Sequence, residues 1–239
     1  MIVYGINPVL EALRTGRVRE LRVTDRASGR VGETLALATE RGVPVRRIPV
    51  GELARQARGG VHQGVVALVE DARACSVEDL VRGAAGPPLL VVLDGIEDPH
   101  NLGAILRTVD AAGADGVVVQ SRRSAALGGA AAKASAGAVA HVRIAEVVNI
   151  ARALEELKAA GVWTIGLAGD AGLTYDAVDF RLPTAIVLGA EGTGLRRLVR
   201  DRCDALAAIP MQGHVDSLNV SVAAGVTLFE AARQRRRDP

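Results

Sequence analysis

The sequence predicts an α/β protein in which a small α/β unit precedes a larger unit with a mostly parallel sheet. Extended apolar segments and helical segments alternate along the 239 residues, a pattern typical of parallel strands connected by helices. Residues 89–93 are continuously apolar, as expected of a strand buried on both faces. Segment 72–88 closes with two glycines and two prolines, which favours a linker. The predicted division is therefore residues 1–71, a linker at 72–88, and residues 89–239.

The small unit is predicted to contain three helices and three strands. Asn7 is placed to cap the first helix, with Pro8 in the first turn, where proline's missing N–H removes no helical hydrogen bond. The remaining elements follow from the spacing of apolar residues: strands at 18–24, 43–48 and 65–70, and helices at 33–41 and 51–58.

The larger unit continues the alternation after the strand at 89–93. Asp98 and Pro99 open a helix that ends near Gly113. Further strands are predicted at 117–119, 162–167, 184–188 and 205–209, and further helices at 150–160 and 195–203. The last helix is predicted from Ser217 to about residue 235, with a buried stripe at helical spacing formed by Leu218, Val222, Val226 and Phe229.

The composition allows a substantial core and excludes several classes of protein. Hydrophobic residues make up 49% of the chain, and 29 basic residues nearly balance 27 acidic ones. A nucleic acid must therefore be held by a local basic surface, and the first 70 residues carry 11 Arg against 7 acidic residues. Aromatic residues are only 2%, which argues against RNA recognition by rows of stacking side chains.

No metal site, disulfide or membrane segment is expected. Cys75 and Cys203 are too few for a disulfide framework, and the four histidines lie far apart in the sequence. The N-terminus does not resemble a signal peptide, and no apolar run approaches the length of a membrane span. These features predict a soluble, cytoplasmic protein.

Three short motifs carry the functional information. They occupy residues 98–108, residues 186–192, and residues 209–211 together with 217–223. Taken singly, they can be read as an ordinary helix start, a turn after a strand, and the cap of a helix. The glycines of the second motif do not have the spacing of a dinucleotide-binding fingerprint, and no Gly-Lys-Ser/Thr follows to make a phosphate-binding loop.

In this order the motifs resemble those of the SpoU/TrmH family of RNA ribose 2'-O-methyltransferases. The resemblance implies a deep trefoil knot in the C-terminal part, S-adenosylmethionine as cofactor, a homodimer, and no metal. Five positions match the reaction centre of the family: Asn101, Arg107, Glu191, Ser217 and Asn219. Six positions are expected to contact the cofactor: Leu188, Gly189, Gly192, Ile209, Met211 and Leu218.

Further segments resemble the bacterial members that methylate a guanosine ribose in 23S rRNA. They lie at residues 4–13, 62–67, 133–138 and 228–234. The resemblance implies a ribosomal-protein-like RNA-binding domain at the N-terminus and a target in the peptidyl-transferase P loop. Two alternatives stay open: a related enzyme acting on tRNA or another rRNA nucleotide, including the antibiotic-resistance type, and a non-catalytic rRNA-binding assembly factor.

Arg107 is expected to act as a clamp rather than a base. A guanidinium is effectively never deprotonated in a protein. We therefore predict that Arg107 binds the phosphate near the target and stabilises negative charge developing on the 2'-oxygen. Glu191 is expected to order its loop or the dimer rather than to take up a proton.

Overall fold

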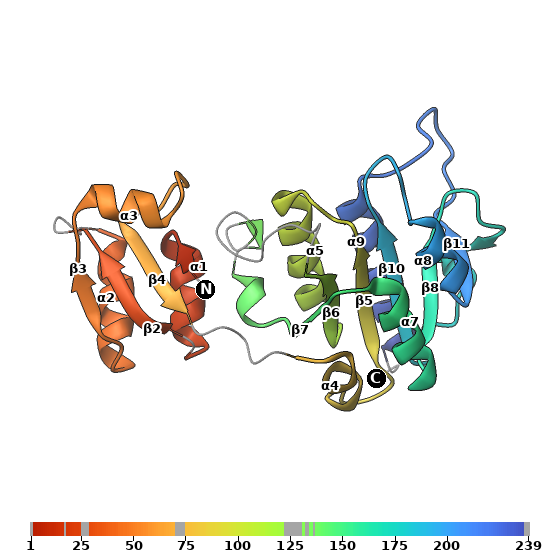
Figure 1. Cartoon of the computed structure of the whole chain (residues 1–239), viewed down its shortest axis with the longest axis horizontal. Coiled ribbons are helices and arrows are strands. Elements are labelled where there is room, and N and C mark those ends of the chain that lie inside the picture. The colour runs from red at the N-terminus through yellow and green to blue at the C-terminus, as the bar shows by residue number, and fades with distance from the viewer. Residues whose placement is uncertain are drawn as a thin grey trace.

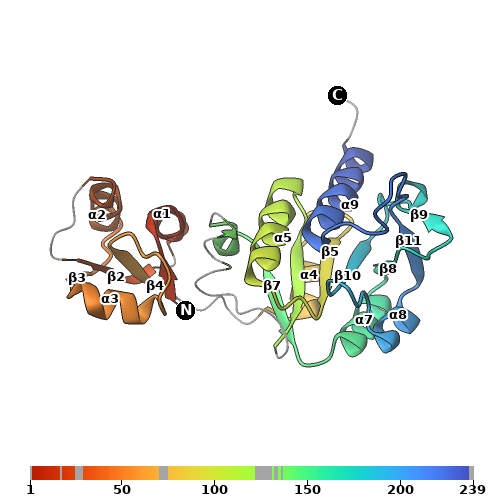
Figure 2. The ribbon, with the colours of Figure 1, turned by 90° about the horizontal axis from the view of Figure 1, so that it is seen from above.

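Two separate sheets organise the chain (Figures 1 and 2). The computed structural model describes residues 2–16, 18–24, 29–69, 75–121, 131, 134–135 and 137–236. The predicted boundary at residue 71 and the C-terminal residues 237–239 lie outside this described part. None of the described helices is both long enough and apolar enough to cross a membrane.

The N-terminal unit is a four-stranded mixed sheet with helices on both faces. Its elements are β1 (Ile2–Tyr4), α1 (Ile6–Arg14), β2 (Val18–Val23), α2 (Val31–Glu40), β3 (Val45–Arg47), α3 (Val50–Gln56) and β4 (Val65–Val69). The strand order is β1-β4-β2-β3, with β4 antiparallel to both of its neighbours. Figure 2 shows α1 and α2 on one face and α3 on the other.

The predicted cap of the first helix is wrong. Helix α1 begins at Ile6 and is capped by Gly5, whose φ of 92° suits glycine. The Ile6 N–H is satisfied by the side-chain oxygen of Gln63 at 3.0 Å, a partner 57 residues away that local spacing does not reveal. Asn7 instead accepts a hydrogen bond from Arg30 (3.1 Å).

The C-terminal unit is a seven-stranded, all-parallel sheet of order β7-β6-β5-β10-β8-β11-β9. The strands are β5 (Leu89–Asp94), β6 (Gly116–Gln120), β7 (Ile144–Val147), β8 (Trp163–Leu167), β9 (Leu173–Thr174), β10 (Thr184–Gly189) and β11 (Ala205–Ala208). All of β5 is buried, as the apolar run predicts. Short 3-10 turns lie at Ala138–Ala140 and Tyr175–Ala177. The trefoil knot stays a prediction.

Helices cover both faces of this sheet. Helices α5 (Pro99–Ala112) and α9 (Val220–Arg235) share one core with β5 and β10, while α4 (Val77–Arg82), α7 (Ile150–Ala159) and α8 (Arg197–Arg202) share the other (Figure 2). Helix α5 has the predicted ends: Asp98 caps it by accepting the His100 N–H (2.9 Å), and Gly113 ends it at a φ of 72°.

The segment expected to be a linker contains helix α4. Ser76 and Asp79 form a capping box at its start. Val77 and Leu80 are buried in the core that α7 shares with the sheet, so this part of segment 72–88 packs with the larger unit.

The predicted buried stripe of the last helix is wrong. The residues of α9 that face the core are Val220, Ala224, Thr227, Leu228 and Ala231, whereas Val222 and Phe229 are 49% and 47% exposed. Leu218 precedes the helix and is also exposed, and Val226 is only partly buried. Apolar residues occur around the whole helix, so spacing alone does not single out a face. Three of the inward-facing side chains, Ala224, Thr227 and Ala231, are small, which suits the packing of α9 on α5.

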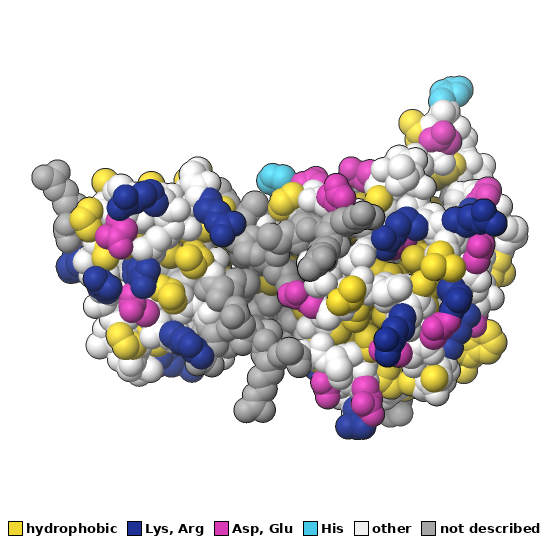
Figure 3. Space-filling view, in the orientation of Figure 1, with side chains coloured by type: hydrophobic (Ala, Val, Ile, Leu, Met, Phe, Trp, Pro, Cys, Tyr) yellow, Lys and Arg dark blue, Asp and Glu magenta, His cyan; other side chains and the backbone are white. Residues whose placement is uncertain are grey.

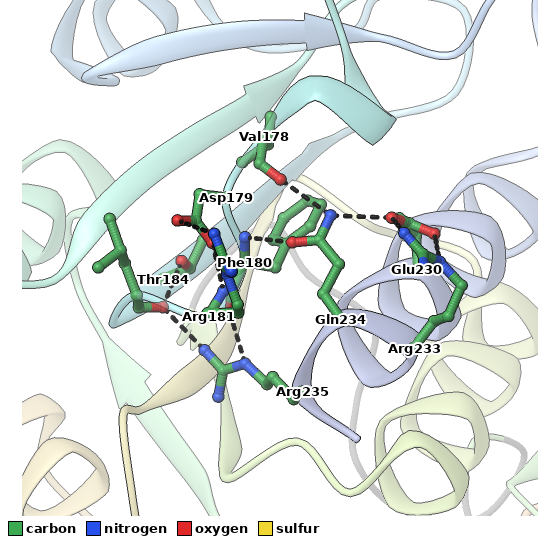
Figure 4. A network of polar contacts seen from close by, with 10 residues as sticks. Val178, Asp179, Phe180, Arg181, Thr184, Glu230, Arg233, Gln234 and Arg235 are labelled. Carbon is green, nitrogen blue, oxygen red and sulfur yellow. Dashed lines mark hydrogen bonds and ion pairs between the residues drawn. The ribbon is translucent and has the colours of Figure 1, made fainter. Parts of the chain in front are cut away.

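Figure 4 shows how the C-terminal end of α9 is held. The Arg235 guanidinium donates to the backbone oxygens of Phe180 (2.6 Å), Leu182 (2.9 Å), Pro88 (3.1 Å) and Pro87. Gln234 accepts from the Phe180 N–H (2.9 Å) and donates to the Val178 carbonyl (3.0 Å). The last turn of the helix is thereby tied to the segments that enter β5 and β10.

Candidate active site

The main cleft opens at the carboxyl ends of β8, β10 and β11, where parallel α/β sheets commonly bind ligands. Its volume is about 570 Å³, within the range of small-molecule sites. Residues 189–195, four of which are glycine or alanine, line one part of it. Apolar side chains expected to contact the cofactor form part of the rest: Ile209, Met211 and Leu218.

The loop at residues 190–195, which we call the glycine loop, folds back onto the strand that it leaves. Ala190 and Gly194 exchange two backbone hydrogen bonds of 3.1 and 2.9 Å. A Cβ on Gly189 would lie only 2.1 Å from the Gly194 backbone, so a side chain there is excluded by the loop itself. Gly192, with a φ of 75°, occupies the left-handed region. Glycine at position 189 is therefore required for the loop to close.

Three of the five predicted reaction-centre residues meet at Asn219. Its amide nitrogen donates to Asn101 Oδ1 (3.0 Å) and to a carboxylate oxygen of Glu191. Its amide oxygen accepts from the backbone and the hydroxyl of Ser221 (2.9 and 2.6 Å), which caps α9. Both ends of the amide are thus occupied, and the orientation of Asn219 is fixed.

The remaining predicted residues are placed differently. Ser217 lines the main cleft and donates its hydroxyl to Asp216 (3.0 Å). Leu188 is buried inside the sheet beneath the cleft and does not line it. Arg107 is exposed on α5 and lines neither cavity, and within the described part of the chain it makes no hydrogen bond or ion pair.

A second cavity adjoins the main cleft. It measures about 420 Å³ and shares Ala190, Glu191, Thr193 and Val220 with its neighbour. Its other walls come from residues 95–98 and from Asn101, at the start of α5. The Asn219 cluster therefore stands where two cavities meet, which suits a reaction between two bound molecules.

Two ion pairs near the cleft were missed by sequence reasoning. At the cleft wall, the Arg200 guanidinium donates two hydrogen bonds of 2.9 Å to the Asp170 carboxylate. These hydrogen bonds lower the pKa of Asp170. Beneath the glycine loop, Arg196 pairs with the fully buried Asp94. Asp94 ends an otherwise apolar strand, a signal that could have identified it. Among the described residues, no group of three His, Cys, Asp or Glu side chains could hold a metal ion.

Comparisons with known proteins find relatives for both units of the chain. Residues 88–229 match the model of the SpoU rRNA Methylase family, and residues 2–74 match the model for RNA 2'-O ribose methyltransferase substrate binding. The 23S rRNA (guanosine-2'-O-)-methyltransferase RlmB of Pseudomonas aeruginosa is 46% identical over 242 residues, covering 98% of this chain and 96% of that protein.

Solved structures extend the similarity to the fold. The SpoU methyltransferase AviRb from Streptomyces viridochromogenes, in complex with the cofactor AdoMet, aligns with a TM-score of 0.80 and 27% identity, covering 98% of this chain and 90% of that one. The AdoMet-bound rRNA methyltransferase from Sinorhizobium meliloti aligns with a TM-score of 0.78 and 29% identity, covering 97% and 86%.

Proposed function

The chain belongs to the SpoU rRNA methylase family, and from this premise we propose that it transfers the methyl group of S-adenosylmethionine to the ribose 2'-hydroxyl of a guanosine in 23S rRNA. The observation that carries the proposal is the Asn101–Asn219–Glu191 cluster at the junction of two cavities. Relatives named for this reaction match the chain over almost its full length.

The main cleft suits S-adenosylmethionine. Its volume is adequate, its apolar side chains suit an adenosyl group, and the glycines of the loop let the backbone approach a ligand closely. Bound there, the cofactor supplies an electrophilic methyl group that needs no metal to activate it. Ile209, Met211, Leu218 and Gly192, which all line the cleft, would hold it.

The residues of the chain orient the acceptor. Because Asn101 Oδ1 is occupied by Asn219, its amide N–H groups remain to donate toward the second cavity, where the target ribose would lie. Glu191 holds the glycine loop against Asn219. Alignment of the two reactants is the main requirement of such a transfer.

We also propose a homodimer. The exposed apolar face of α9, with Val222 and Phe229, suits a contact with a second copy. Arg107 lies outside the cavities of its own chain, which suits a role as phosphate clamp at the cleft of that second copy.

We propose that the N-terminal unit binds the RNA substrate and that the protein works in the cytoplasm, where ribosomes are assembled. Lys and Arg side chains, all of them arginines in this unit, are spread over its visible face (Figure 3). Arg41, Arg46, Arg55 and Arg58 are among the exposed residues of this unit. Contacts of this kind make RNA affinity fall with rising salt.

The test is transfer of tritium from labelled S-adenosylmethionine to total rRNA and tRNA from a strain that lacks the gene, followed by nuclease mapping. Label on a guanosine ribose of 23S rRNA, expected in the P loop, supports the proposal. Label in tRNA or elsewhere in rRNA would keep the chemistry and change the substrate. No label in any RNA, ribosomal precursors included, would favour a non-catalytic binding factor.

A further inference from the structure

A buried carboxylate lies below the glycine loop. Asp94 is the last residue of β5, is fully buried, and stands beside Gly189 in the register of β5 and β10. One carboxylate oxygen accepts a hydrogen bond from the backbone N–H of Arg196 (2.8 Å), and the other accepts a hydrogen bond from Nε of the same residue (2.6 Å). Asp94 therefore fixes both the backbone and the side chain at the point where the loop ends.

The contacts continue across the neighbouring strands. Arg196 Nη2 donates to Gln120 Oε1 (2.9 Å) at the end of β6, and Gln120 Nε2 donates to the Val148 carbonyl (3.1 Å) just beyond β7. Strands β7, β6, β5 and β10 are successive neighbours in the sheet. The side chains of Asp94, Gln120 and Arg196 therefore join these four strand ends to the glycine loop.

The position of Glu191 depends on both ends of the glycine loop. At one end the loop continues from β10, and at the other Arg196 is held by Asp94. Between them Glu191 meets Asn219, which also binds Asn101. We propose that Asp94 is a positioning residue for methyl transfer, acting through Arg196 to set the glycine loop against the cofactor and the Asn219 cluster. The inference rests on the proposed function and deepens it.

Removal of the charge should disturb the loop specifically. In Asp94→Asn, one oxygen becomes an NH2 group, so a donor faces either the Arg196 N–H or its Nε. Arg196 also loses its counter-charge, although its own side chain is 44% exposed. The reverse change, Arg196→Ala, leaves the fully buried Asp94 carboxylate unpaired, which is strongly unfavourable. A small misplacement of groups at a reaction centre can reduce the rate by about 100-fold.

The experiment compares full-length Asp94→Asn, Arg196→Ala and Arg196→Lys with the wild type. Calorimetry with S-adenosylhomocysteine, which needs no RNA, should show affinity weakened by about tenfold or more in the first two variants. Steady-state kinetics with 23S rRNA should show a raised KM for S-adenosylmethionine and a lowered kcat, with the KM for RNA unchanged. Arg196→Lys should recover part of the loss because it retains the charge.

Arg197→Ala is the matched control, since Arg197 is the next residue but is highly exposed and, among the residues that the structure describes, reaches only Asp201 (3.8 Å). The double variant Asp94→Asn/Arg196→Ala should be no worse than the poorer single variant, because residues that act through one another are not additive. If the losses in affinity and kcat of the two single variants add fully in the double variant, the proposal is overturned. It is also overturned if the variants have a lower Tm but bind S-adenosylhomocysteine and turn over like the wild type at temperatures well below that Tm. A wild type that binds no S-adenosylhomocysteine would overturn the proposed function as well.

Discussion

At the scale of single residues, Asn219 has two separable roles. Its oxygen caps α9, and its nitrogen joins Asn101 to Glu191. Asn219→Ser should keep the cap and the Tm but lower kcat by about 100-fold or more, the loss typical of a removed donor at a reaction centre. Asn219→Ala should lose the cap as well as the amide nitrogen, so both the Tm and kcat should fall. Ser221→Ala, which leaves Asn101 and Glu191 in place, is the control in methyl-transfer assays paired with melting curves. Wild-type turnover in Asn219→Ser would contradict the role of the amide nitrogen.

Glu230 leads to a prediction about acid stability. Hydrogen bonds from Arg233 and Gln234 lower the pKa of Glu230 from 4.5 to about 2. Because the folded-state pKa lies below the unfolded one, its contribution to stability is fully present above about pH 4.5 and is lost as the pH falls toward 2. Urea unfolding at pH 7 and pH 3 should therefore show a smaller loss of unfolding free energy for Glu230→Gln than for the wild type. Equal losses would show that this carboxylate is not responsible.

At the scale of elements, Arg235 fastens the end of α9 to two strand entries (Figure 4). Four backbone carbonyls share its guanidinium, and Arg235→Ala would leave them without this donor. We expect the free energy of unfolding to fall by about 2 to 3 kcal/mol in urea titrations. Arg236→Ala, at the exposed next position, is the control and should change it by less than about 0.5 kcal/mol. Similar losses in the two variants would contradict the anchoring role.

The helices also show which features neighbouring residues in the sequence can predict. The ends of α5 are predicted correctly because Asp98, Pro99 and Gly113 act on their own backbone. The start of α1 is missed because Gln63, far along the chain, satisfies the Ile6 N–H. The face of α9 is missed because its apolar residues surround the helix, and the packing on α5 decides which of them are buried.

At the scale of the whole molecule, the exposed face of α9 predicts the oligomeric state. Val222 and Phe229 lie two turns apart on the same face and are about half exposed. Phe229→Asp should therefore leave the fold intact while converting a dimer to a monomer in sedimentation experiments, and methyl transfer should fall with it. Leu198→Asp, at a 55% exposed position on the other face of the sheet, is the control and should remain dimeric. A wild type that is monomeric at all concentrations would contradict the dimer.

The proposed reaction centre shows what the sequence contributes and what the tertiary structure adds. The resemblance in three ordered motifs identified the SpoU/TrmH family, which the family model and the full-length relatives confirm. Spacing alone did not bring Asn101 and Asn219 together, because 118 residues separate them. Their contact depends on how α5 and α9 pack against each other over the parallel sheet.

By itself, the sequence determined the α/β class, the parallel strands, the caps of α5 and the family, because these follow from local spacing, local hydrogen bonds and motif identity. Only the tertiary structure decided which face of α9 is exposed, where Arg107 lies relative to the cleft, and that Asp94 supports the glycine loop. These features depend on contacts between residues far apart in the chain, which form only when neighbouring strand ends and packed helices bring them together.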